Sequence, residues 1–266
     1  VTSTATELNL LDGKAATNLA LIGKTGGTNF TSSLLVGHAT TGTLSSADGN
    51  TGVGIGALDA LTSGDNNLAT GKDAGTSITT SSNNTLVGGE AGFSVNTATG
   101  HNTYVGNAAG YSSAGSYNTG VGARALIGAA GSETGNCAFG YDSLVAVTSG
   151  GYNLGIGYGA GNNITTGSGN VIIGFETAPS ATGSQQLKIT GNNGASSVEW
   201  ISGDSSANVT VGGTLTSDTG LVKTVGKESI WIPSNSMTPS TTNGAERASV
   251  ETTATRPDMQ VLDFDK

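Results

Sequence analysis

An asparagine returns every 16 to 18 residues through the middle of this chain, and a glycine follows each one four positions later. The asparagines are Asn50, Asn67, Asn84, Asn102, Asn118, Asn136, Asn153 and Asn170. The glycines are Gly54, Gly71, Gly88, Gly106, Gly122, Gly140, Gly157 and Gly174. A short fixed period of this kind is typical of architectures in which each repeat stacks on the next. The repeat therefore predicts an elongated stack of similar coils that projects or displays something.

The composition agrees with a thin stack and disfavours a large globular core. Glycine accounts for 44 of the 266 residues, whereas aromatic residues make up only 5% and charged residues 11%. The low charge also separates the chain from the usual charged disordered class. A net charge of −9 disfavours a nucleic-acid partner, because such proteins carry a basic surface. No apolar run is long enough to predict insertion into a membrane.

The residues that follow each asparagine predict a strand. With the asparagine as position 0, positions +1 and +3 are enriched in β-branched and apolar residues, as in Thr51 and Val53. Side chains alternate along a strand, so these two positions share a face, and we expect that face to point inward. Cys137 at +1 would then be a small buried hydrophobe. Positions +7 and +8, such as Ala57 and Leu58, predict a second, shorter inward face, so that one repeat contains two short strands and two turns.

The invariant glycine and asparagine predict structural roles. Glycine at every +4 position indicates a backbone requirement, either a positive φ or a close approach between chains. Asparagines stacked in successive coils can bond to one another and to the turn backbone as an amide ladder. A row of ligand-binding amides is the alternative role for this column.

These observations predict an all-β, fibrous β-solenoid or β-roll of about eight 17-residue coils over residues 48–179. Because a stack this thin buries little apolar surface in each coil, we expect several chains to associate along the axis as a homotrimer. Residues 180–226 are expected to form β-hairpins of a fibre shaft.

The two ends of the chain are expected to form different modules. Residues 1–47 predict a connector with a short helix, because Thr4 and Glu7 fit a capping box and Gly13 fits a C-terminal stop. Residues 227–266 contain three of the four prolines and predict the start of a C-terminal β module, which would include any receptor-binding tip.

Two sets of motifs resemble known fibrous proteins. The stretches Asn66–Gly71 (NNLATG) and Asn83–Gly88 (NNTLVG) resemble the head repeats of trimeric autotransporter adhesins, which implies a left-handed parallel β-roll wound as a trimer. The segment Thr6–Gly13 (TELNLLDG) resembles a module of marine-phage tail fibres. Three later segments resemble fibre-shaft hairpins: Gln186–Ile189, Val198–Asp204 and Asn208–Leu215.

The resemblances imply an extracellular virion protein, a tail fibre or similar appendage that mediates attachment to the host surface. Its implied partners are copies of itself, other virion tail proteins and a host cell-surface glycan or protein receptor. A bacterial surface adhesin head and a polysaccharide-cleaving tail spike are the alternatives.

Position +5 carries the best candidate for binding. Tyr141, Tyr158 and Phe175 occupy it in three successive repeats, which would place their rings about 4.8 Å apart in a ladder. An exposed ladder could bind glycans by stacking on sugar rings. The alternative is aromatic packing that stiffens the rod or a seam between subunits.

Other chemistry has little support in the residues. Asp73 and Glu90 at position +6 could form the paired acids of a glycosidase, although a solvated charged edge is the simpler interpretation. His38 and His101 lie far apart, with no cysteine or carboxylate at metal-ligand spacing. Glycine-rich stretches such as Gly52–Ala57 recur with the repeat and lack the helix of a dinucleotide site. We therefore expect no enzymatic activity, no metal and no cofactor.

Overall fold

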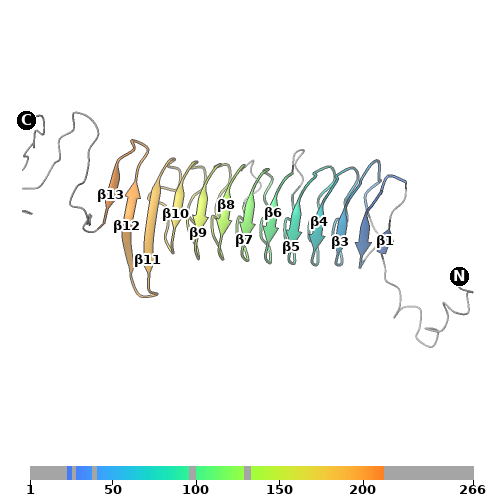
Figure 1. Cartoon of the computed structure of the whole chain (residues 1–266), viewed down its shortest axis with the longest axis horizontal. Coiled ribbons are helices and arrows are strands. Elements are labelled where there is room, and N and C mark those ends of the chain that lie inside the picture. The colour runs from blue at the N-terminus through green and yellow to red at the C-terminus, as the bar shows by residue number, and fades with distance from the viewer. Residues whose placement is uncertain (1–22, 26–27, 38–40, 96–99, 129–132, 213–266) are drawn as a thin grey trace, which may run out of the picture. The chain divides into compact units, whose positions relative to one another are not determined.

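The computed structural model describes residues 23–25, 28–37, 41–95, 100–128 and 133–212. These residues form one sheet of thirteen strands, in which the spatial order of the strands follows their order in the chain (Figure 1). The predicted helix at Thr4–Gly13 and the predicted C-terminal module at 227–266 lie outside the described residues. No described segment is a helix, so none is long and apolar enough to span a membrane.

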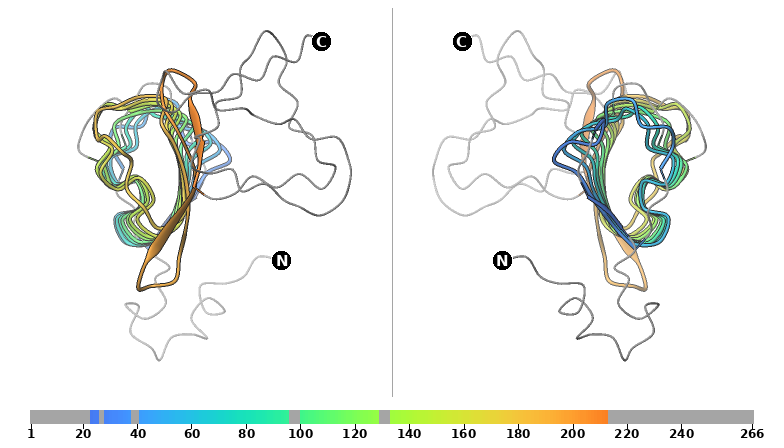
Figure 2. Two further views of the ribbon diagram at one scale, coloured as in Figure 1. Left: turned by 90° about the vertical axis from the view of Figure 1, so that its left-hand side faces the viewer. Right: turned by 90° about the vertical axis from the view of Figure 1, so that its right-hand side faces the viewer.

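The sheet is parallel over most of its length. Strands β2 to β11 pair in parallel, β1 pairs antiparallel with β2, and β12 and β13 continue antiparallel from β11. The strands are β1 (Gly23–Thr25), β2 (Leu34–Val36), β3 (Thr51–Val53), β4 (Leu68–Thr70), β5 (Thr85–Val87), β6 (Thr103–Val105), β7 (Thr119–Val121), β8 (Cys137–Phe139), β9 (Leu154–Ile156), β10 (Val171–Ile173), β11 (Leu187–Asn192), β12 (Ser197–Gly203) and β13 (Val209–Val211). Figure 2 shows successive coils superimposed along the stack, with their strands on one side.

The β-solenoid predicted from the repeat is confirmed, with about nine turns instead of eight. One additional coil precedes the asparagine repeats: Ser33 takes the asparagine position before β2, and Gly37 follows at +4 with φ 108°. At the other end Gln186 takes the asparagine position before β11. The stack extends past the asparagines because serine and glutamine make the same hydrogen bonds.

The predicted inward face of the strands is wrong. Position +2 points inward, as Leu86 and Ile172 show, whereas positions +1 and +3 point outward and are half-buried or exposed. The interior is too narrow for two bulky columns: a Cβ added to Gly52 would overlap the Leu35 side chain of the preceding coil. Position +2 therefore combines glycine and alanine with occasional large residues, and the β-branched residues are left for the outer face.

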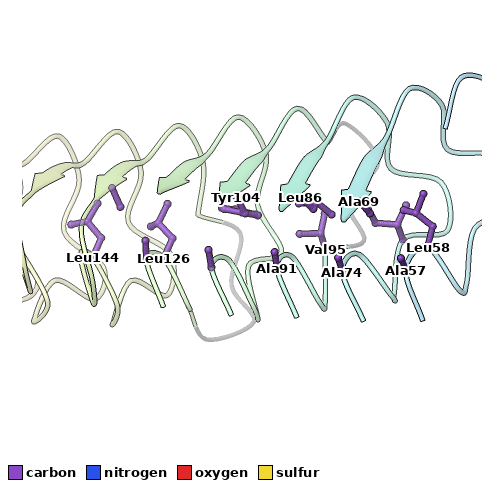
Figure 3. Close-up of a cluster of buried hydrophobic side chains, with 14 of the residues drawn as sticks. Ala57, Leu58, Ala69, Ala74, Leu86, Ala91, Val95, Tyr104, Leu126 and Leu144 are labelled. Carbon is purple, nitrogen blue, oxygen red and sulfur yellow. The ribbon is translucent and has the colours of Figure 1, made fainter. Parts of the chain in front are cut away.

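The remainder of the core comes from the turns. The predicted inward positions +7 and +8 are confirmed, with Ala57 and Leu58 fully buried (Figure 3). They do not form the expected second strand, because backbone φ is positive at +6 and +8 in most coils, which gives tight bends. A further buried column stands at +11, made by Leu61, Ile78, Val95, Val147 and Ile164.

A lysine occupies the inward position of the last parallel strand. Lys188 aligns with Ile172 of β10, and its ammonium lies 3.7 Å from a Glu176 carboxylate oxygen and 3.8 Å from one of Glu199. A half-buried ion pair thus ends the apolar core at the coil where the antiparallel strands begin.

Candidate functional site

The asparagine column forms a continuous amide ladder inside the solenoid. Asn67 Nδ2 donates to Asn50 Oδ1 at 3.0 Å, and the Asn67 backbone N–H donates to the same oxygen at 3.0 Å. Asn67 Nδ2 also donates to the carbonyl of Ser81 in the next coil at 2.9 Å. The arrangement recurs along the stack, and the asparagines are all buried. The amides are occupied by one another and by the turns, which leaves them no freedom to hold a ligand.

The +4 glycines bring successive backbones into close approach. Their φ values run from 111° to 137°, a range that side-chain-bearing residues rarely adopt. A Cβ at Gly88 would overlap the backbone carbonyl of Gly106 in the next coil. Both backbone requirements that the sequence suggested, positive φ and close approach, hold at this position.

One coil interior is polar. Tyr104, at position +2 of β6, is fully buried, and its hydroxyl lies 2.6 Å from Ser113 Oγ. Ser113 stands in the +11 column, whose other buried members are leucine, isoleucine and valine. The absence of a side chain at Gly120 leaves space for the Tyr104 ring in the neighbouring coil. Each of the two buried hydroxyls therefore depends on the other for this hydrogen bond.

A buried glutamate lies beside this pair. Glu133 is 1% exposed, and neither carboxyl oxygen has a hydrogen-bond partner among the described residues. Burial raises the pKa of Glu133 to about 7, although the nearby Ser113 hydroxyl and backbone groups act in the opposite direction. Its own backbone carbonyl accepts from Asn118 Nδ2 of the ladder at 3.0 Å. The ladder thus fixes the backbone of Glu133. The corresponding acceptor carbonyls in the other described coils belong to glycine, alanine or serine. The Glu133 side chain is therefore held inside the coil by its backbone position.

The predicted aromatic column exists at the surface. Tyr141 and Tyr158 stack with centroids 5.2 Å apart, and Phe175 meets Tyr158 edge-on at 5.1 Å. The three side chains are 40%, 57% and 47% exposed. Arg124 lies 5.8 Å from the Tyr141 centroid, over the ring. Since the faces of Tyr141 and Tyr158 meet neighbouring groups, a ligand would meet ring edges and hydroxyls. The glycan-binding role stays a prediction.

Two further aromatic pairs follow the same repeat. His101 and Tyr117, at position −1, stack at 5.1 Å, and Phe93 and Tyr111, at position +9, stack at 4.9 Å. Their sequence separations equal those of the adjacent asparagines, so the repeat itself was the signal that could have found them.

The candidate acids at +6 lie in the bends of adjacent coils. The Asp73 carboxylate is bound by the ammonium of Lys72, its neighbour in the chain. Both Asp73 and Glu90 occupy left-handed bends of the coil, with φ 56° and 59°. No cluster of histidine, cysteine or acidic residues suited to a metal ion occurs in the described part of the chain.

Cys137 differs from its predicted surroundings. It lies at +1 on the outer side of β8 and is half-buried instead of enclosed in the core. Burial raises the pKa of its thiol. The prediction of a buried Cys137 is wrong because Cys137 is at position +1, which points outward and not inward as predicted.

Comparison with known protein families, with curated proteins and with solved structures found no match. The geometry of the chain is therefore the basis for any proposal on function.

Proposed function

We propose that this protein is a structural fibre protein, a segment of a virion tail fibre or similar appendage that attaches the particle to its host. The observation that carries the proposal is the uninterrupted amide ladder. It joins Ser33, the asparagines and Gln186 in one buried column, so that each coil is hydrogen-bonded to the next.

A stack built this way suits a mechanical role. Ten parallel strands at about 4.8 Å spacing give a rod roughly 43 Å long from this segment alone. Every coil has the same backbone path, so the rod can be lengthened by further coils without a new fold. The proposed unit is a homotrimer, in which three copies would raise avidity for a host-surface receptor by effective concentration. No catalytic role is proposed for the chain.

An antibody raised against residues 41–212 tests this role. We expect it to decorate an appendage of intact particles in electron micrographs and to slow adsorption to host cells, while antibody preabsorbed with the protein does neither. Particles that carry the protein internally, or adsorption unaffected by saturating antibody, would contradict the proposal.

The receptor class is tested at the aromatic column. If host glycans bind along Tyr141, Tyr158 and Phe175, a Tyr158→Ala variant should lose about two- to tenfold in affinity on a host-glycan array, since the contacts of one aromatic ring supply about 0.5–1.5 kcal/mol. Tyr111→Ala, in a different stacked pair, is the matched control. Equal binding by both variants and the parent would remove the glycan role from this column.

A further inference from the structure

The outward positions of the strands line up as two continuous columns, which we call the outer stripe. It consists of positions +1 and +3 of β2 to β11, together with the residues paired with them on β12 and β13. One column contains Leu34, Thr51, Leu68, Thr85, Thr103, Thr119, Cys137, Leu154, Val171, Leu187, Gly203 and Val209. The other contains Val36, Val53, Thr70, Val87, Val105, Val121, Phe139, Ile156, Ile173, Ile189, Ile201 and Val211.

The outer stripe carries no charge along its whole length, although the chain has 29 charged residues, 19 acidic and 10 basic. Threonine is its main polar residue, and valine, leucine and isoleucine fill most other places. In the single chain Val53, Phe139 and Ile156 are 38%, 40% and 38% exposed. Uncharged, β-branched residues of this kind suit a packed strand face, yet none of the residues that the structure describes covers them.

Exposed large apolar side chains of the coils gather beside the stripe as well. On β2 to β10 and their turns they occupy only positions −1, +1, +3 and +5: Leu34, Val53, Ile55, Leu68, Tyr117, Phe139, Tyr141, Tyr152, Ile156, Tyr158 and Phe175. The turns on the other sides of the coil contribute none among the described residues. On β2 to β10 and their turns, the exposed apolar side chains therefore form one band parallel to the stack, which is the sign of an interaction surface.

We infer that copies of this chain pack against one another through the outer stripe, parallel and in register, around an axis that runs alongside the sheet. The inference deepens the proposed fibre by assigning its chain–chain interface. The stripe repeats at the spacing of the strands over its full length, and a second copy presents a surface of the same spacing and the same length. Cyclic symmetry keeps every strand at the same height in all copies and closes the assembly.

The dimensions of the band agree with a stable interface. Eleven steps between β2 and β13 span about 53 Å, and the six residue steps from −1 to +5 span about 20 Å. The band therefore offers roughly 1,000 Å² per chain, or about 500 Å² toward each of two neighbours, so that each pairwise contact buries about 1,000 Å² in total, the lower end of the range for specific interfaces. Three chains suit a band this wide, because one half of it can face each neighbour.

Solution mass with charge substitutions tests the surface. We expect the parent chain to be a trimer by light scattering at micromolar concentration. Val105→Lys with Val121→Lys places two charges in the middle of the stripe, and we expect dissociation to increase about 100-fold or more while the β-sheet circular dichroism is kept. Ser149→Lys with Thr166→Lys, on exposed turns of adjacent coils, is the matched control and should stay trimeric. A monomeric parent, or a lysine stripe variant that stays trimeric, overturns the inference.

Crosslinking tests the register without relying on a destabilised variant. In a Cys137→Ser background, Val53→Cys places a single thiol near the N-terminal end of the stripe. Parallel copies in register bring these thiols together, so a short bismaleimide should give crosslinked dimers, which is the most that one thiol per chain allows, and Thr80→Cys on an outer turn should give none. Absence of crosslinks in an assembled Val53→Cys protein would show an antiparallel or staggered arrangement and refute the stated geometry. If the protein is a trimer but the antibody against residues 41–212 does not decorate virions, the interface stands and the proposed fibre function is refuted.

Discussion

Glu133 should make the stability of this protein fall as the pH rises. Its pKa is raised by burial from an ordinary 4.5 to about 7 in the folded chain, so the folded state holds this proton more tightly than the unfolded state does. The stabilising contribution is complete below about pH 4.5 and is lost as pH rises through 7. The difference of about 2.5 pKa units corresponds to roughly 3 kcal/mol, because one unit is worth 1.36 kcal/mol.

The Glu133→Gln variant isolates this contribution, because glutamine keeps the shape and cannot ionise. Urea unfolding at fixed protein concentration should show the variant gaining up to about 3 kcal/mol on the parent chain between pH 4.5 and pH 8. Comparing the two proteins across pH cancels any constant cost of burying the amide. Glu90→Gln, at an outer bend of the coil, is the control and should track the parent at both pH values. An unchanged difference between Glu133→Gln and the parent at both pH values would show that the carboxyl is not desolvated in the folded chain.

Three other experiments probe the interior of the rod. Asn84→Ala should cost about 3–5 kcal/mol in urea unfolding, because it leaves buried donors of the next coil without their acceptor; a loss below 1 kcal/mol would mean that water replaces the amide. Gly88→Ala should lower the unfolding free energy by about 2–3 kcal/mol or more, whereas Gly89→Ala, whose Cβ would have the Asn107 side-chain nitrogen at 3.2 Å as its nearest neighbour, should be near neutral; equal effects would refute the close-approach argument. Tyr104→Phe and Ser113→Val should each cost about 1–2 kcal/mol and the double variant less than their sum; strict additivity would exclude coupling between the two hydroxyls.

The repeat in the sequence was sufficient to predict the solenoid, and it failed on which strand face is buried. Alternation in a strand places +1 and +3 on one side and +2 on the other, but it does not say which side is the core. The β-branched residues at +1 and +3 suggested the core because they suit any packed face. Only the closed coil shows that its interior is too narrow for two such columns and admits one side chain of limited size at +2.

The repeat pattern also could not predict where the stack ends or which coil has a polar interior. Ser33 and Gln186 continue the asparagine column with different side chains, and their equivalence is visible only in the hydrogen bonds they make. Glu133 lies far from Tyr104 in sequence, and the stacking of coils brings it to the same interior.

The sequence alone determined the coil, its period and the need for asparagine and glycine, because each of these is a local backbone requirement repeated in every turn. The tertiary structure decided what faces inward, where the stack begins and ends, and that an uncharged apolar stripe is left outside. Those properties depend on how much space a closed coil encloses, and that space is set by residues that meet only after successive coils have stacked.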